Sequence, residues 1–305
     1  MKRFLAKRLI ASTVIMWFAT VLVFSLSRAA GDPTYLFISE YTTDEVIAEW
    51  RKEFGLDRPY PIQYITWLWP AIRGDFGASL NEARPAFDVV IQKVPATLQL
   101  AAVSFAFAIA VGIPIGALSA VRRGSWWDLI GRVIALIGQA TPNFWMGIML
   151  VLLFSVQFEL LPTSGRGGVD HYVLPAITLG SGSAAGLVRL TRSAMLEMLD
   201  SEFVKFARAK GVSGETVVWK HAFRNSLIVP ITYAGLILAG FTTGTVVVET
   251  VFGWPGLGRL AVTATNDNDF PVMIATVLLF TLMYIIVNFV VDVSYAIIDP
   301  RIRRA

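Results

Sequence analysis

Apolar residues along this chain gather in six long blocks that polar and charged stretches separate. A helix that crosses the hydrocarbon of a bilayer needs roughly 20 mostly apolar residues, and every block approaches or exceeds that length. Glycine and serine dilute the fourth block, which suits a helix packed closely inside a bundle. The pattern predicts an all-α, polytopic membrane protein with six transmembrane helices. The blocks cover residues 9–27, 97–120, 133–156, 172–190, 227–248 and 272–298.

Composition supports a membrane protein and excludes several kinds of site. Of the 305 residues, 55% are hydrophobic and only 16% are charged, and the mean hydropathy is +0.61. The chain has no cysteine, and its two histidines, His171 and His221, are far apart in sequence, so we expect neither disulfides nor a metal site. No GxxxxGK[ST] phosphate loop is present, so we expect no nucleotide or other cofactor on this chain.

Most of the 26 lysines and arginines fall in four clusters that alternating spans would place on one side. The clusters are MKRFLAKR at the start, RRGSWWDLIGR after the second block, residues 189–224, and RIRRA at the end. Because cytoplasmic loops carry the excess of positive charge, both termini are predicted in the cytoplasm. The first apolar run is longer than a signal-peptide core, so we interpret it as an uncleaved helix.

This topology divides the chain into three parts. Residues 1–28 form the cytoplasmic N-terminus and first span, residues 29–96 a loop on the outer side, and residues 97–305 a five-helix core with a cytoplasmic loop at 191–226. In the outer loop, TTDEVIAEWRKEFGL predicts an amphipathic helix that ends at Gly55, and IQYITWLWPAI predicts a second apolar face. The loop suits a cap on the outer membrane surface, a docking surface for an outside partner, or both.

The cytoplasmic loop contains a basic stretch with a glycine near its middle. Residues 192–210 lack glycine and proline, so we expect one helix that continues the fourth span until Gly211 ends it. Ser213 is placed to cap a short second helix over 214–224. That helix has Val217, Val218, His221 and Ala222 on one side and Trp219 and Phe223 on another. The shape fits either a protein-docking hairpin or an interfacial helix anchored by its tryptophan.

Polar residues within the apolar blocks are candidates for a translocation path, although each also suits an ordinary helix contact. Pro142 predicts a kink in the third block. A glutamate before GWPGLG is placed either to pair with Arg259 or to meet the ammonium group of a solute. The path candidates are Gln139, Asn143, Thr243, Glu249, Asn288 and Asp292.

The stretch EFVKFARAKGVSGETVVWKHAFRNSLIVP resembles the cytoplasmic loop of ABC importer membrane subunits. In that loop a Glu-Ala-Ala region precedes a glycine and a short coupling helix. Glu202, Ala207 and Gly211 match this order, whereas Phe203 replaces an alanine and Arg224 replaces a proline. The chain is also similar to the dipeptide/oligopeptide permease family in segments along its whole length, which are FGLDRP, RGDFGASL, VPATLQLA, HYVLPAITLG, TRSAMLEML, VFGWPGLGRL and VDVSYAIIDPRIR.

The resemblance implies a type I ABC importer permease fold with an extra N-terminal helix and a large periplasmic loop, in a bacterial inner membrane. It implies a second homologous permease subunit, two ATP-binding subunits that hold ATP and Mg, and an extracytoplasmic solute-binding protein. Short peptides are the favoured solutes, with glutathione-like peptides, opines and nickel chelates open. The implied ATPase-coupling residues are Glu202, Ala207, Gly211, Val212, Ser213, Glu215, Val217, Val218, Trp219, His221 and Arg224.

Two other classes of function fit the sequence less well. A proton-coupled secondary transporter predicts internal repeats and paired intramembrane acids. No repeat is visible, and only Asp292 and Glu249 qualify as acids. An intramembrane enzyme needs a nucleophile–base pair or metal ligands at bilayer depth, and the sequence offers none.

Overall fold

The computed structural model describes residues 2–29, 43–53, 55–243 and 245–298. Within these residues every regular element is a helix, apart from an isolated bridge between Ala78 and Pro85, so the all-α prediction is confirmed. Four helices are long and apolar enough to cross a membrane, and two bent helix pairs raise the number of possible spans to six. The chain divides into two compact units, Met1–Lys93 with Leu260–Ile285, and Val94–Arg259 with Ile286–Ala305. These units carry no information on membrane sides, so the division at 28 and 96 stays a prediction.

The first unit is built around one aromatic cluster. The ring of Phe24 is 1% exposed and packs edge-on against Tyr60 and Tyr64, with the ring centroid of Trp67 at 5.4 Å. The hydroxyls of Thr20 and Tyr64 share a hydrogen bond of 2.8 Å. The helices of this unit are α1 (Lys2–Ala29), α2 (Asp44–Glu53), α3 (Tyr60–Ala71), α4 (Ala86–Ile91), most of α14 (Leu257–Asn266) and the first part of α15 (Phe270–Ile298).

The amphipathic helix predicted after the first span is present, and the second apolar stretch is helical as well. α2 covers the amphipathic stretch, and Gly55 follows it with a φ of +65°, a left-handed conformation that glycine adopts without strain. α3 covers the second apolar, aromatic-rich stretch, with Pro59 at its N-cap and a second proline in its first turn. The side of the membrane on which they lie remains a prediction.

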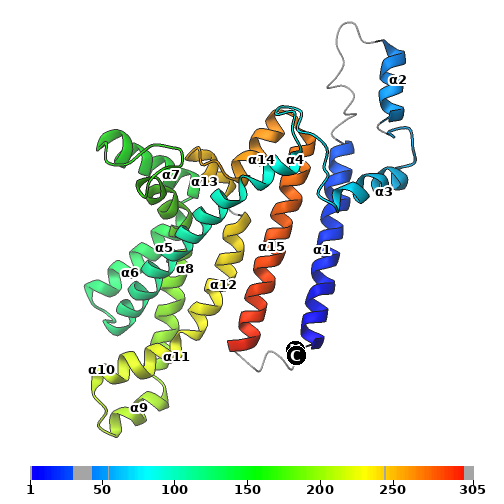
Figure 1. Cartoon of the computed structure of the whole chain (residues 1–305). Helices are drawn as coiled ribbons and strands as arrows, with labels where there is room; N and C mark the ends of the chain where they lie inside the picture. The colour runs from blue at the N-terminus through cyan, green and yellow to red at the C-terminus, as the bar shows by residue number, and fades with distance from the viewer. Residues whose placement is uncertain (1, 30–42, 54, 244, 299–305) are drawn as a thin grey trace. The chain divides into compact units, whose positions relative to one another are not determined.

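The second unit is built on two long helices, α5 (Val94–Val121) and α8 (Asp170–Leu199), which pack closely along their length (Figure 1). Small residues allow this approach: a Cβ at Gly112 would lie 2.5 Å from Leu187 Cβ, and one at Gly116 would lie 2.6 Å from the Val188 carbonyl oxygen. Further helices pack around this pair. The unit contains α5 (Val94–Val121), α6 (Trp126–Ala140), α7 (Asn143–Leu150), η2 (Val151–Gln157), α8 (Asp170–Leu199), α9 (Glu202–Ala209), α10 (Gly214–Thr216), η3 (Val217–Phe223), α11 (Arg224–Ser226), α12 (Ile228–Thr243) and α13 (Val246–Val251).

The third and fifth apolar blocks are not continuous helices, which corrects the prediction. α6 ends at Ala140, and the chain turns by 109° before α7 begins at Asn143. Thr141 has an extended backbone (φ −87°, ψ 122°) because the proline that follows it disfavours the helical conformation. The fifth block begins in α12, bent by 43° from the helical stretch before it, and ends in the separate helix α13.

The predicted helix over residues 192–210 is also divided. α8 ends at Leu199, and α9 begins two residues after Asp200, with Ser201 in an extended conformation as its N-cap. The Ser201 hydroxyl accepts a hydrogen bond from the Val204 N–H at 3.4 Å. An N-cap of this kind starts a new helix without any glycine or proline.

Candidate functional site

α9 and the run from α10 to α11 form a hairpin at one end of the second unit (residues 202–226, Figure 1). Its interior is closed by Val204, Ala207, Val217 and Ala222, which are all buried and pack against Met195 of α8. This small buried core holds the two helical segments of the hairpin together, so the positions of its exposed side chains are fixed relative to one another.

Several large apolar side chains of the hairpin are exposed. Phe203 is 51% exposed, Phe206 62% and Trp219 47%. The Trp219 ring packs edge-on against Phe223, with centroids 5.5 Å apart, and the Lys210 ammonium lies over the Phe206 ring at 4.5 Å. The hairpin also carries exposed charges, most of them positive. The exposed charged residues are Glu202, Lys205, Arg208, Lys210, Glu215, Lys220 and Arg224.

The structure sorts the predicted coupling residues into three groups. Glu202, Gly211, Ser213, Glu215, Trp219 and Arg224 are exposed, and Val212, Val218 and His221 are half-buried. Ala207 and Val217 are buried, so in this conformation they support the hairpin from within and offer no surface to a partner. Phe203 and Phe206 were not among the predicted contacts, although their spacing opposite Val204 and Ala207 was available as a signal.

The turn of the hairpin follows the prediction in its backbone and departs from it in one side chain. Gly211 has a φ of +79°, and the second helix begins at Gly214. Ser213 takes the N-cap position, but its hydroxyl donates to Thr216 Oγ1 at 2.9 Å and caps no backbone N–H.

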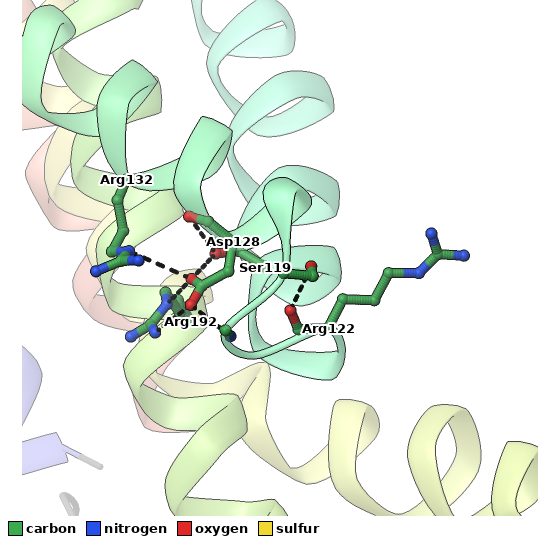
Figure 2. Close-up of polar contacts among 7 residues, drawn as sticks. Ser119, Arg122, Asp128, Arg132 and Arg192 are labelled. Carbon is green, nitrogen blue, oxygen red and sulfur yellow. Dashed lines mark hydrogen bonds and ion pairs between the residues drawn. The ribbon is translucent and has the colours of Figure 1, made fainter.

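A buried carboxylate joins α6, the α5–α6 turn and α8, close to the hairpin (Figure 2). Asp128 is 2% exposed and accepts hydrogen bonds from the Ser119 hydroxyl at 2.7 Å and the Gly124 N–H at 3.0 Å. Arg192 donates to both of its oxygens, at 2.7 and 3.1 Å. The Nε of Arg132 lies 3.7 Å away. This site was not predicted, because nothing in the spacing of Asp128 and Arg192 along the chain indicates that they meet.

A second feature of this unit is a cavity of about 370 Å³ between α7, α8 and α12. Asn143, one of the predicted path residues, lines it together with Ser183 and Tyr233. Gln139, another path residue, is exposed and accepts a hydrogen bond of 3.0 Å from Arg189. The structure thus places these two predicted path residues four positions apart in sequence, on either side of the 109° bend.

Glu249 occupies a different environment from the open path predicted for it. Its side chain is fully buried, and its carboxylate accepts hydrogen bonds from the Thr97 hydroxyl at 2.7 Å and the Arg259 backbone N–H at 3.0 Å. The guanidinium of Arg259 instead donates to the Gly253 carbonyl. Glu249 is therefore closed to solutes in this conformation and fixes the loop that contains GWPGLG.

The remaining path candidates lie elsewhere. Asn288 and Asp292 are half-buried on α15, and Thr243 is the last residue of α12, with its side chain outside the described residues. Within the described ranges, no group of three or more histidines, aspartates or glutamates is arranged to hold a metal ion.

Two family models match nearly the whole chain. Residues 1–101 match the N-terminal part of a binding-protein-dependent transport system membrane component, and residues 112–304 match the inner membrane component itself. The glutathione transport system permease protein GsiC of Salmonella choleraesuis (strain SC-B67) is 40% identical over 304 residues, which is 99% of both chains. The protein of the same name in Escherichia coli (strain K12) is 39% identical over the same share.

Solved structures of transporters share the fold. An inward-facing MetNI methionine ABC transporter chain matches with a TM-score of 0.56 and 19% identity, over 69% of this chain and 96% of that one. A chain of an amino acid ABC transporter crystallised with histidines matches with a TM-score of 0.55 and 14% identity, over 68% and 92%. Together with the matches along the sequence, these findings show that the chain belongs to the family of binding-protein-dependent transport system inner membrane components, the permease subunits of ABC importers of the peptide type.

Proposed function

We propose that this permease subunit imports short peptides and receives the motion of its ATPase through the hairpin at residues 202–226. ABC importers of this family work with ATPase subunits and a binding protein. The finer assembly proposed here has a second homologous permease subunit, two ATP-binding subunits that hold ATP and Mg, and an extracytoplasmic solute-binding protein.

The observation that carries the docking proposal is the exposed aromatic patch on a closed hairpin core. Phe203, Phe206 and Trp219 are exposed, whereas Val204, Ala207, Val217 and Ala222 form the buried core of the hairpin. Tryptophan and arginine dominate the energetics of protein interfaces, and a cationic rim favours an acidic partner surface. The patch therefore fits an ATPase cleft with an apolar floor and acidic edges.

The proposed solute class rests on the relatives. The curated proteins that match over the full length of the chain are named glutathione transport permeases. We infer a short peptide, glutathione-like in size, as the solute, ahead of opines and nickel chelates. The cavity beside Asn143 and the adjacent Gln139 support a path on this face of the second unit.

The proposed topology has both termini in the cytoplasm and residues 29–96 on the periplasmic side. The positive clusters support it, since the hairpin and the α5–α6 turn are both rich in arginine and lysine. Docking of the ATPase on the hairpin requires the same orientation.

Replacement of Trp219 tests the docking proposal. In the complete transporter, Trp219→Ala should lower co-purification of the ATPase by about 30-fold, because an interface hot spot contributes about 2 kcal/mol or more. Trp219→Asp should abolish both association and transport. Trp126→Ala is the matched control: this tryptophan is 78% exposed at the start of α6, outside the hairpin, and its loss should leave association unchanged.

Normal ATPase recovery and normal uptake with Trp219→Asp would show that the hairpin is not the docking site. Equal losses with Trp219→Ala and Trp126→Ala would indicate a general effect of removing an exposed tryptophan at the membrane surface.

A further inference from the structure

Arg189 is a cation in an unusual position within the second unit. It lies on α8, and its guanidinium donates a hydrogen bond of 3.0 Å to Gln139 at the end of α6. Along α6, Gln139 is about 16 Å from Asp128, whose contacts fix the arginine-rich α5–α6 turn. Gln139 and the guanidinium bonded to it therefore lie about three turns of α6 away from that charged turn. A cation at membrane depth is costly and marks a solute or ion path.

The partner of Arg189 leaves its charge uncompensated. Arg192, one turn further along α8, donates to the Asp128 carboxylate through two of its three guanidinium nitrogens (Figure 2). Arg189 meets only the neutral amide oxygen of Gln139 among the described residues, and both side chains are exposed. A guanidinium has five N–H donors in a fork that matches a carboxylate, so this hydrogen bond leaves most of its capacity open.

The cavity between α7, α8 and α12 is lined by Ser183, which lies six residues before Arg189 on α8, about 9 Å along the helix. Side chains on a helix lean toward its N-terminus, so Arg189 extends toward Gly186 and the cavity-lining Ser183. Gly186 has no side chain of its own, and the Tyr233 hydroxyl fills that place: a Cβ at Gly186 would lie 2.5 Å from it. Tyr233, Ser183 and Asn143 all line the cavity. None of the residues that line it is acidic, so nothing in its wall competes for the cation.

We propose that Arg189, positioned by Gln139, binds the carboxylate of a peptide as it passes through this cavity. The cavity volume of about 370 Å³ lies within the range of small-molecule sites, about 300–1,000 Å³. The polar side chains of Asn143, Ser183 and Tyr233 are placed to meet the peptide bonds, and the guanidinium selects for a free carboxylate. This inference rests on the proposed import of peptides, and it adds a charge preference that belongs to the permease and not to the binding protein.

Uptake of a peptide and of its C-terminal amide by the complete transporter tests the proposal. Each is supplied at a concentration that saturates the binding protein, so that binding-protein affinity does not enter the comparison. Arg189→Gln should lower uptake of the free acid about 10- to 100-fold, the size of a lost charge-assisted hydrogen bond, and change uptake of the amide little. Arg189→Lys should retain part of the preference.

Two further variants sharpen the test. Gln139→Glu keeps the arginine and gives it an internal carboxylate, so it should remove the preference for the free acid even if Arg189→Gln fails to assemble. Arg166→Gln is the matched control, because Arg166 donates to Gln99 at 2.6 Å in the same kind of arginine–glutamine pair outside the cavity. It should leave the ratio of acid to amide uptake unchanged.

An acid-to-amide ratio that stays at its wild-type value in Arg189→Gln and Gln139→Glu overturns the proposal. Equal loss of both substrates in these variants overturns it too, since that result assigns Arg189 to packing or to a partner subunit. If the wild-type transporter imports neither peptide form while its ATPase still assembles on it, the peptide assignment itself is wrong and this inference falls with it.

Discussion

Two buried carboxylates illustrate how single residues hold the second unit together. Asp128 is satisfied by an arginine, a serine and a backbone N–H, and Glu249 by a threonine and a backbone N–H. An unpaired buried carboxylate is expensive, so each of these groups requires its donors to stay in place. Both therefore act as fixed points at which helices distant in sequence meet.

Glu249 is connected to the rest of the unit through a chain of hydrogen bonds. The Leu257 N–H donates to the Thr97 hydroxyl at 2.8 Å, and this hydroxyl donates to Glu249. Beside it, the Trp254 indole donates to the Ala96 carbonyl at 2.9 Å. The start of α5 is thereby tied to α13 and to the loop before α14.

Glu249→Ala should destabilise the protein by about 2–6 kcal/mol, because it leaves two buried donors without an acceptor and each costs about 1–3 kcal/mol. Glu249→Gln retains one acceptor oxygen and should cost less. Thermal unfolding in detergent measures both. The path role first expected of Glu249 predicts the opposite pattern, namely normal stability with impaired transport, and that result would refute the structural role.

Residue identities alone did not reveal these sites. The sequence marks Glu249 as an acid near a glycine-rich turn, which fits a solute path and a structural anchor equally well. The choice depends on Thr97, which is distant in sequence, and on Gly256, whose missing side chain leaves room for the carboxylate. No periodicity in the sequence connects these three positions.

At the scale of elements, hydropathy located the helices well and their interruptions poorly. Five of the six apolar blocks correspond to α1, α5, α8, α12 and α15, and the third is divided between α6, α7 and η2. A long apolar run must be helical to satisfy its backbone in a bilayer. Pro142 signalled a kink, but the 109° angle depends on packing that the sequence does not express. The break after α8 has neither glycine nor proline to mark it, and its signal, the serine N-cap at Ser201, lies inside a polar stretch that favours a continuous helix.

The two serines of the hairpin allow a matched test of capping. The Ser201 hydroxyl accepts from the Val204 N–H, whereas that of Ser213 bonds only a side chain. Ser201→Ala should destabilise α9 by about 1 kcal/mol, which corresponds to amide exchange about fivefold faster in that helix.

Ser213→Ala should leave exchange in α10 and η3 near the wild-type rate, because no backbone donor loses its acceptor. Hydrogen exchange of the detergent-solubilised transporter measures both helices in one experiment. A similar acceleration in both variants would mean that Ser213 caps its helix after all.

At the scale of the whole molecule, family membership fixes the class of activity. The chain is the permease subunit of an ABC importer in a bacterial inner membrane, and ATP hydrolysis takes place in separate subunits. This excludes the proton-coupled secondary transporter that was the alternative. The motifs of the sequence were sufficient to predict this class of transporter. Composition and hydropathy alone predict only a polytopic membrane protein.

The bent pair formed by α6 with α7 and η2 is compatible with two membrane topologies. If residues 126–157 cross the membrane as one broken span, the α5–α6 turn and the loop before α8 lie on opposite sides; a re-entrant pair would place both on the same side. The proposed six-span topology requires the first arrangement. Because the chain has no cysteine, single cysteines report on each loop without background.

Asp57→Cys and Val169→Cys should react with an impermeant maleimide in intact spheroplasts, and Arg123→Cys and Ser213→Cys only after permeabilisation. Asp57, Val169 and Arg123 are well exposed, as is Ser213, so reactivity depends on the side of the membrane and not on burial. Labelling of both Arg123→Cys and Val169→Cys from one side would make the pair re-entrant. A re-entrant pair would leave five spans and place the C-terminus outside the cytoplasm. The expected pattern of labelling instead places the hairpin in the cytoplasm, where ATP is available to its partner.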